Sequence, residues 1–96
     1  YSASKHAMEG FCKSMALDLA ENGIRVNTVC PTFIETDLTR PFMEENEFKD
    51  YILSRIPLGH VGQTEDVADA VLFLASDMSK MVTGSNIKVD GGWTAV

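Results

Sequence analysis

Gly23-Ile-Arg-Val-Asn-Thr-Val-Cys-Pro31 is the stretch of sequence that decides the fold. Its residues 24–30 form a short run rich in β-branched side chains, which predicts a strand. Pro31 ends this strand because proline has no N–H to donate to a ladder. The preceding Asn22-Gly23 pair is a stop signal for a helix. A helix, a tight turn and a strand in this order make half of a parallel crossover unit, so the sequence predicts an α/β fold.

The helix that leads into this strand is predicted over residues 3–21, and it carries two stripes at helical spacing. Small side chains that allow close approach of another helix form one stripe: Ala3, Ala7, Gly10 and Ser14. Bulky apolar side chains form the other: Met8, Phe11, Met15 and Leu19. Tyr1 and Lys5 continue into the bulky side, so we expect them to face the protein body. Glu9 and Lys13 are expected to form an exposed pair on the remaining side.

Downstream of this unit, the sequence predicts two more helices and one more strand. Residues 31–41 are expected to form a loop and residues 44–56 a helix. Residues 64–75 are expected to form a helix that buries Val67, Val71, Leu72 and Ala75. Residues 86–89 form the second predicted strand, followed by a turn and a tail with Trp93. Such a pair of strands does not make a stable parallel sheet alone, and the chain opens on Tyr1 rather than methionine. We therefore expect a piece of a longer protein whose other strands lie elsewhere.

Composition argues against several classes of function. The net charge of −6 is unfavourable for nucleic-acid binding, which needs clustered lysine and arginine. Cys12 and Cys30 are too few for a disulfide scaffold, and no Cys/His cluster has the spacing of a zinc site. We expect both cysteines to be small buried side chains in a reducing compartment, the cytoplasm. No apolar run approaches the roughly 18 residues of a membrane span. The sequence therefore predicts no metal, no nucleic acid and no membrane as partners.

Tyr1 and Lys5 form the candidate acid/base pair of the chain. Residues i and i+4 lie on one face of a helix, with Cβ atoms about 5–6 Å apart. An ammonium at that distance favours the phenolate form of a tyrosine, which makes the phenol usable as an acid/base at neutral pH. The alternative is a surface tyrosine that happens to lie near a lysine.

Four motifs, in order and across nearly the whole chain, resemble the C-terminal part of a classical short-chain dehydrogenase/reductase. They are Tyr1-Ser-Ala-Ser-Lys5, Gly23-Ile-Arg-Val-Asn-Thr-Val-Cys-Pro31, Pro31-Thr-Phe-Ile-Glu-Thr36, and the run from Thr64-Glu-Asp-Val-Ala to Val89-Asp-Gly-Gly92. The resemblance implies the C-terminal portion of a Rossmann-like, doubly wound parallel sheet that is incomplete in this chain. It also implies that residues 1–96 are a single partial domain, in which residues 37–60 form a substrate lid.

The resemblance implies catalytic roles for the acid/base pair. Tyr1 is expected to exchange a proton with the substrate's alcohol or carbonyl oxygen. Lys5 is expected to hold the nicotinamide ribose hydroxyls and to keep the phenol acidic. Both residues therefore also count among the predicted cofactor-binding residues.

Four residues of the loop after the first strand are the other predicted cofactor-binding residues: Pro31, Thr32, Ile34 and Thr36. The carboxyl end of a parallel strand is where open α/β sheets bind ligands. By analogy with the family, backbone groups near Ile34 and the hydroxyl of Thr36 hold the nicotinamide carboxamide. The alternative for Thr36 is a cap for the following segment. The family usually has glycine where this chain has Thr32, and glycine permits a positive φ that threonine does not easily adopt.

The implied function is that of an oxidoreductase that transfers a hydride between NAD or NADP and a secondary alcohol or ketone. The sequence resembles 3-oxoacyl-carrier-protein reductases and sugar or polyol dehydrogenases about equally. Phe42, Met43, Phe48, Tyr51 and Leu58 are expected to pack within the lid, with pocket lining as the alternative. His60 is expected to be an exposed loop histidine, with substrate or cofactor contact as the alternative.

A homo-oligomer, a dimer or a tetramer, is the expected assembly, formed through helix 3–21 and the C-terminal strand and tail. The alternative function is a non-catalytic C-terminal fragment that keeps only the oligomerisation surfaces. The family's glycine-rich turn, which cradles the pyrophosphate, does not occur in these 96 residues. We therefore expect the isolated chain neither to bind a dinucleotide tightly nor to turn over.

Overall fold

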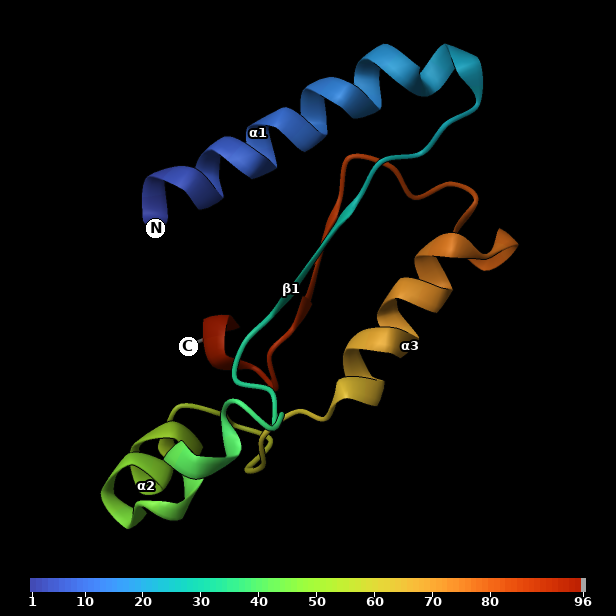
Figure 1. Ribbon diagram of the computed structural model, residues 1–96. Helices are drawn as coiled ribbons and strands as arrows, with labels where there is room; N and C mark the ends of the chain where they lie inside the picture. Colours follow the sequence, from blue (N-terminus) through green and yellow to red (C-terminus); the bar gives the residue numbers. More distant parts are fainter. Residues whose placement is uncertain (96) are drawn as a thin grey trace. The chain divides into compact units, whose positions relative to one another are not determined.

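The computed structural model describes residues 1–95 and shows an α/β chain (Figure 1). The helices are α1 (Ser2–Leu19), α2 (Asn46–Ser54) and α3 (Thr64–Ala75), and the strands are β1 (Thr28–Pro31) and β2 (Asn86–Val89). Short 3-10 helices are η1 (Ala20–Asn22), η2 (Arg40–Glu44), η3 (Asp77–Ser79) and η4 (Trp93–Ala95). The predicted helices at 3–21 and 64–75 are confirmed. The one predicted at 44–56 is shorter at both ends, because Glu44 belongs to η2 and Arg55 is the C-cap of α2.

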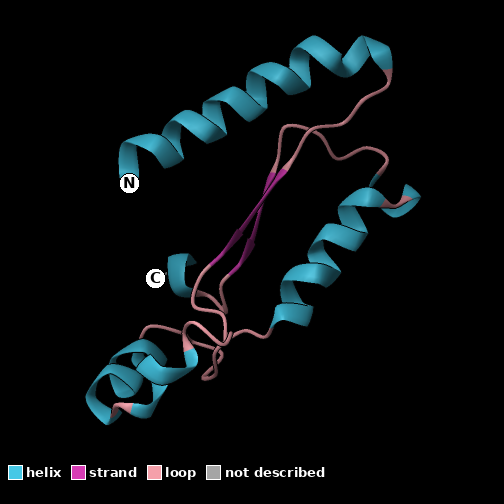
Figure 2. Ribbon diagram, in the orientation of Figure 1, coloured by secondary structure: helices cyan, strands magenta, loops and turns pink. Residues whose placement is uncertain are grey.

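Strands β1 and β2 are hydrogen-bonded neighbours in a two-stranded sheet (Figure 2). The Thr28 N–H donates to the Ser85 carbonyl at 3.0 Å, and the Thr32 N–H donates to the Val89 carbonyl at 3.3 Å. Both strands therefore advance in the same direction, and the predicted parallel pairing is confirmed.

The chain forms two compact units. The first contains Tyr1–Val29 and Ala70–Ile87, and the second contains Cys30–Asp69 and the residues from Lys88 on. The interpretation of residues 1–96 as one partial domain with a lid at 37–60 stays a prediction. None of the helices among residues 1–95 combines the length and the apolar character that crossing a membrane requires.

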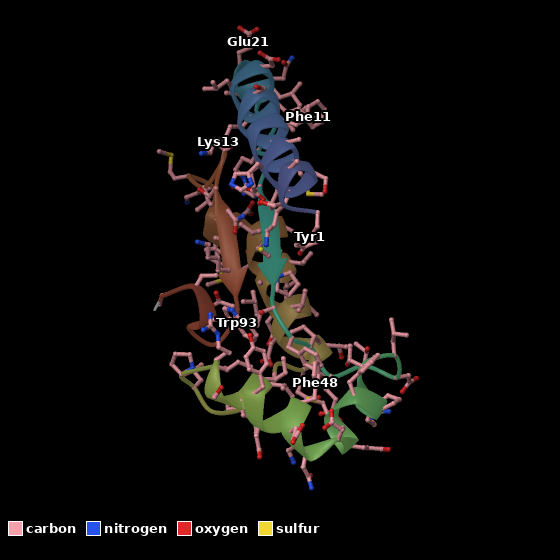
Figure 3. The ribbon with its side chains drawn as sticks, turned by 90° about the vertical axis from the view of Figure 1, so that its left-hand side faces the viewer. Tyr1, Phe11, Lys13, Glu21, Phe48 and Trp93 are labelled. Carbon is pink, nitrogen blue, oxygen red and sulfur yellow. The ribbon has the colours of Figure 1, made fainter. Side chains whose placement is uncertain are left out.

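In the first unit, α1 contacts the chain before β1 through small side chains. Cys12 and Ala16 are 4% and 3% exposed, and the Cys12 thiol donates to the Val26 carbonyl at 3.5 Å. The bulky stripe is only partly covered by the described residues: Met15 and Leu19 are half-buried, whereas Met8 is 61% exposed and Phe11, which projects from α1 in Figure 3, is 66% exposed. The expectation that this stripe faces the protein body is therefore met only in part within this chain.

The expected ion pair of Glu9 with Lys13 is replaced by a different contact. Glu9 is half-buried, and both of its carboxylate oxygens lie 3.0 Å from the hydroxyl of Thr28 in β1. This contact helps to fix α1 against β1. Both cysteines are free; Cys12 is buried as predicted, whereas Cys30 is only half-buried.

The first strand begins later than predicted, at Thr28 rather than at residue 24. The Val26 N–H donates to the Thr83 hydroxyl at 3.1 Å, and the Asn27 side chain accepts from the Ser85 N–H at 3.0 Å. Side chains thus satisfy the backbone here, where a ladder was expected. This alternative is typical of threonine and asparagine.

The prediction that α3 buries its apolar face is wrong for three of its four residues, and none of the four is fully buried. Val71 is 50% exposed and Leu72 is 68% exposed, because no described element covers this side of the helix. Ala75 is also exposed, and Val67 is half-buried. A helix that remains apolar on an exposed side is typical of a surface that packs on further protein.

The core of the second unit consists of Ile52 and Ile56, which are 5% and 2% exposed. The ring of Phe48 lies 5.8 Å from that of Phe33 and 5.9 Å from that of Phe42, measured between centroids. Figure 3 shows Phe48 among the α2 side chains. These ring contacts agree with the expected packing for Phe48, whereas Tyr51 and Leu58 are 58% and 69% exposed, so the expectation is not met for those two residues.

Candidate active site

Tyr1 and Lys5 lie one helical turn apart at the start of α1. Tyr1 is the N-cap residue of the helix, and the Lys5 N–H donates to the Tyr1 carbonyl at 3.0 Å. This i to i+4 bond puts the two side chains on one face, as predicted. Tyr1, which is labelled in Figure 3, is 96% exposed. Lys5 is half-buried. The described residues of this chain therefore leave the Tyr1 phenol open to a ligand.

Pro31 and Thr32 lie at the carboxyl end of β1. Among residues 1–95, every residue with a positive φ is a glycine, so Thr32 has an ordinary backbone conformation. Its N–H donates to the Val89 carbonyl and extends the sheet by one residue. Threonine thus fits without strain at the position where the family usually has glycine.

The backbone around Ile34 is held from two sides. Ile34 forms a parallel bridge with Gly62, in which Glu35 N–H donates to the Gly62 carbonyl at 2.8 Å and Gly62 N–H donates to the Phe33 carbonyl at 3.1 Å. Because backbone groups alternate along an extended chain, the Ile34 N–H and carbonyl point away from Gly62. The Ile34 carbonyl accepts from the Thr39 hydroxyl at 2.6 Å. No acceptor among residues 1–95 is recorded for the Ile34 N–H.

The hydroxyl of Thr36 is part of a pair with Thr39. Thr36 N–H donates to the Thr39 oxygen at 2.8 Å, Thr39 N–H donates to the Thr36 oxygen at 3.2 Å, and the two hydroxyl oxygens lie 3.2 Å apart. Thr36 therefore caps the following segment, which was the alternative for this residue. A cap of this kind leaves hydroxyl capacity unused, so it does not exclude ligand contact.

Glu35 ties the loop to the segment before α3. Its carboxylate accepts from Gln63 Nε2 at 2.9 Å and from Arg40 Nε at 3.3 Å. The amide of Gln63 first and the guanidinium of Arg40 second hold the pKa of Glu35 below its usual value. Arg40 also forms an ion pair with Asp37 at 2.7 Å. These contacts are exposed, so they order the loop more than they stabilise the fold.

A cavity of about 630 Å³ lies beside this loop in the second unit. It is lined by Thr32, Ile56, Pro57, Leu58, His60, Gly62, Asp66, Asp69, Lys88, Val89, Asp90, Gly91 and Gly92. His60 is exposed, and its Nδ1 donates to the Val61 carbonyl at 3.1 Å. Within residues 1–95, no three histidine, cysteine or acidic side chains gather in a way that would hold a metal ion.

Asp90 has the most constrained carboxylate of the cavity lining. It accepts from the Thr94 hydroxyl at 2.6 Å, from the Thr94 N–H at 3.1 Å and from the Gly92 N–H at 3.0 Å. The Thr94 hydroxyl and then the Gly92 N–H lower the pKa of Asp90. This carboxylate closes the turn after β2, and its hydrogen-bonding capacity is mostly used within that turn.

The structure brings together four of the six predicted site residues. Pro31, Thr32, Ile34 and Thr36 share the second unit, whereas Tyr1 and Lys5 share the first. The combination of both groups in one site stays a prediction. Sequence reasoning missed Thr39, although the spacing of Thr36 and Thr39 is that of a hydroxyl that bonds to a backbone N–H three residues away.

The loop after β1 offers two polar groups that are not fully used by the described residues of the chain. The Ile34 N–H can donate one hydrogen bond, and the Thr36 oxygen has remaining capacity to accept one. A primary carboxamide, which has one acceptor oxygen and an NH₂ donor, matches this pair of groups.

A family profile and several known proteins match nearly the whole chain. A family profile described as Enoyl-(Acyl carrier protein) reductase matches residues 1–94. The chain is 45% identical over 95 residues to the short-chain dehydrogenase srdC of Neurospora crassa, covering 98% of this chain and 35% of the relative. It is 50% identical over 92 residues to the 3-oxoacyl-(acyl-carrier-protein) reductase FabG of Thermotoga maritima, covering 96% of this chain and 37% of the relative.

Solved structures also match over the whole chain. A 4-hydroxyisoleucine dehydrogenase complexed with NADH superimposes with a TM-score of 0.95 at 38% identity, covering 100% of this chain and 40% of that one. A gluconate 5-dehydrogenase from Burkholderia cenocepacia in complex with NADP and tartrate gives a TM-score of 0.90 at 38% identity, covering 100% and 38%. The chain thus spans little more than a third of the length of the relatives it matches.

Proposed function

The chain belongs to the short-chain dehydrogenase/reductase family, and on this premise we propose that it carries the acid/base pair and part of the nicotinamide site of an NAD- or NADP-dependent oxidoreductase. The resemblance inferred from the motifs is confirmed, as is the Rossmann-like fold class. The observation that supports the proposal is the 3.0 Å hydrogen bond from the Lys5 N–H to the Tyr1 carbonyl, because residues joined by such a bond lie one helical turn apart and share a helix face.

Tyr1 acts as the acid/base in this proposal. Tyr1 is 96% exposed, so a substrate oxygen can reach its phenol. Lys5, one turn onward, favours the phenolate and holds the ribose hydroxyls of the cofactor. In the reducing direction the phenol protonates the substrate oxygen, and in the oxidising direction the phenolate accepts the alcohol proton.

The loop after β1 binds the nicotinamide end of the cofactor. Its unused groups fit a carboxamide: the Ile34 N–H donates to the amide oxygen, and the Thr36 oxygen accepts from the NH₂. Pro31 and Thr32 lie next to them at the carboxyl end of β1, where open α/β sheets bind ligands. NAD or NADP, when bound, supplies the hydride acceptor or donor.

The substrate is a small alcohol or carbonyl compound that segment 37–60 covers. This proposal rests on relatives whose names describe 3-oxoacyl and gluconate chemistry. We also propose a homo-oligomer that pairs through the small stripe of α1 and through the C-terminal strand and tail. The small stripe is exposed in this chain. The cytoplasmic location and the inactivity of the isolated 96 residues stay predictions.

Replacement of the acid/base in the intact protein tests this function. Tyr1→Phe removes only the hydroxyl, so we expect turnover to fall by about 10³-fold or more while the Kd of the nicotinamide cofactor changes less than about threefold. Lys5→Met should weaken cofactor binding and turnover together. Lys13→Met is the matched control, because Lys13 is an exposed lysine on the same helix. Retained turnover in Tyr1→Phe would remove Tyr1 from the mechanism.

A further inference from the structure

We propose that Thr39 is a positioning residue that sets which hydrogen bonds the nicotinamide site can make. This inference rests on the proposed function, in which Ile34 and Thr36 hold the cofactor's carboxamide. Thr39 touches neither the cofactor nor the reacting atoms. It acts through its contacts with the two residues that do.

The Thr39 side chain turns away from the helix that follows it. Thr39 is the N-cap residue of η2, a position where threonine normally accepts a hydrogen bond from the first turn. Here the side chain makes no such cap bond. Its hydroxyl instead contacts Ile34 and Thr36, five and three residues back in the chain. The side chain is thus used to organise the loop rather than to begin η2.

The directions of the hydrogen bonds follow from the number of protons available. A threonine hydroxyl has one proton and two lone pairs. The Thr39 proton goes to the Ile34 carbonyl, which can only accept and lies at 2.6 Å, the shortest contact of the group. The 3.2 Å contact between the hydroxyls of Thr39 and Thr36 must then use the proton of Thr36. Thr39 accepts this proton and the Thr36 N–H.

Thr36 is left as an acceptor only. Its proton is committed to Thr39, and one lone pair accepts the Thr39 N–H at 3.2 Å. The remaining lone pair can accept from an NH₂ group but cannot donate to a ligand carbonyl. The pair of threonines therefore favours a carboxamide over a ketone of similar shape at this point of the site.

The Thr39 side chain also fixes the direction of the Ile34 N–H. Gly62 holds the chain on either side of Ile34 through the Phe33 carbonyl and the Glu35 N–H. Thr39 holds the Ile34 carbonyl on the opposite side. With both neighbouring peptide groups held, the Ile34 N–H has one direction and is available to a ligand oxygen.

A cofactor analogue tests the inference directly. In 3-acetylpyridine adenine dinucleotide a methyl group replaces the carboxamide NH₂, so the hydrogen bond to Thr36 is lost while the carbonyl oxygen is kept. In the intact protein we expect the Kd of the reduced analogue to exceed that of the matching reduced natural cofactor by about tenfold. In Thr39→Val this ratio should fall to about twofold or less. The Thr36 hydroxyl is then free to rotate, so its lone pair is no longer held toward the NH₂ group of the natural cofactor. Thr39→Ser keeps the hydroxyl and should restore the ratio.

A measurement without cofactor separates positioning from damage to the fold. The Thr36 N–H loses its acceptor in Thr39→Val, so its hydrogen exchange should become at least about tenfold faster. Exchange of the α1 amides should not change. Thr64→Val, at an exposed threonine that begins α3, is the matched control and should leave both readouts as in the wild type.

The outcomes distinguish the inference from the function on which it rests. If the wild type prefers the natural cofactor and Thr39→Val keeps that preference, Thr39 is not a positioning residue and the inference is wrong. If the wild type binds neither dinucleotide, the proposed function is wrong, and the inference is overturned with it. A ratio that falls in Thr39→Val and returns in Thr39→Ser supports both.

Discussion

Replacement of Arg25 is the sharpest test of how the first unit is held together. Its guanidinium donates to the carbonyls of Leu74 at 2.8 Å, Val82 at 3.2 Å and Ser76 at 3.3 Å. One side chain therefore links the segment before β1 with the end of α3 and with the segment before β2. The contact also puts a positive charge at the C-terminus of α3, where the helix dipole favours it. We expect Arg25→Met to destabilise the protein.

The size of the loss follows from what the three carbonyls retain. The Leu74 carbonyl also accepts from the Ser79 hydroxyl at 2.9 Å, that of Ser76 from the Ser79 N–H at 3.3 Å, and that of Val82 from the Asn27 side chain at 2.9 Å. No carbonyl is left without a donor, so the full penalty for a buried unpaired group does not apply. The charged hydrogen bonds and the helix end together are worth about 2–3 kcal/mol. Arg25→Lys keeps the charge but loses the fork, so it should cost about half as much.

Urea denaturation of the intact protein measures this loss as a shift of the midpoint at unchanged m-value. Arg55→Met is the matched control. Arg55 is exposed, and its guanidinium carbon lies 5.6 Å from the centroid of the Trp93 ring, a contact worth about 0.5–1 kcal/mol. If Arg25→Met costs no more than Arg55→Met, the hydrogen bonds of Arg25 do not hold the first unit together.

Two further predictions concern the C-terminal turn and the assembly. The lowered pKa of Asp90 means that its contribution to stability is complete above its usual value of 3.8 and is lost as the pH falls through the lowered pKa. The difference in thermal midpoint between wild type and Thr94→Val should therefore shrink below about pH 4, and a difference that persists there would contradict the assignment. A Cβ at Gly10 meets nothing within 4 Å, so Gly10→Leu should leave the chain's own packing unchanged but block pairing through α1. Light scattering after size exclusion would measure this, and an unchanged mass would exclude α1 as the pairing face.

Local patterns predicted the helices better than the strands. Helix α3 has the predicted bounds because its apolar spacing and the acidic residues of its first turn, Glu65 and Asp66, are local signals. The strand predicted at residues 24–30 shifted to Thr28–Pro31, because the side chain of Asn27 competes for backbone partners that lie far away in the sequence. Local sequence does not contain those partners.

The candidate site was predictable in part. The spacing of Tyr1 and Lys5 and the position of Thr36 after a strand are visible in the sequence. The role of Thr39 was not predicted, because it depends on whether its single proton reaches the Ile34 carbonyl, the Thr36 hydroxyl or the Thr36 carbonyl, which lies at 3.4 Å. The exposure of Leu72, which a pattern of buried residues does not foresee, depends on whether another element covers α3.

By itself, the sequence determined the order of elements, the parallel crossover and the family, since these follow from residue types at short spacing along the chain. Only the tertiary structure decided that Thr32 needs no positive φ, that Glu9 bonds to Thr28, and that two threonines leave one lone pair for a ligand. The physical reason is that a hydrogen bond between distant segments depends on distances and directions in space, and spacing along the chain does not fix these.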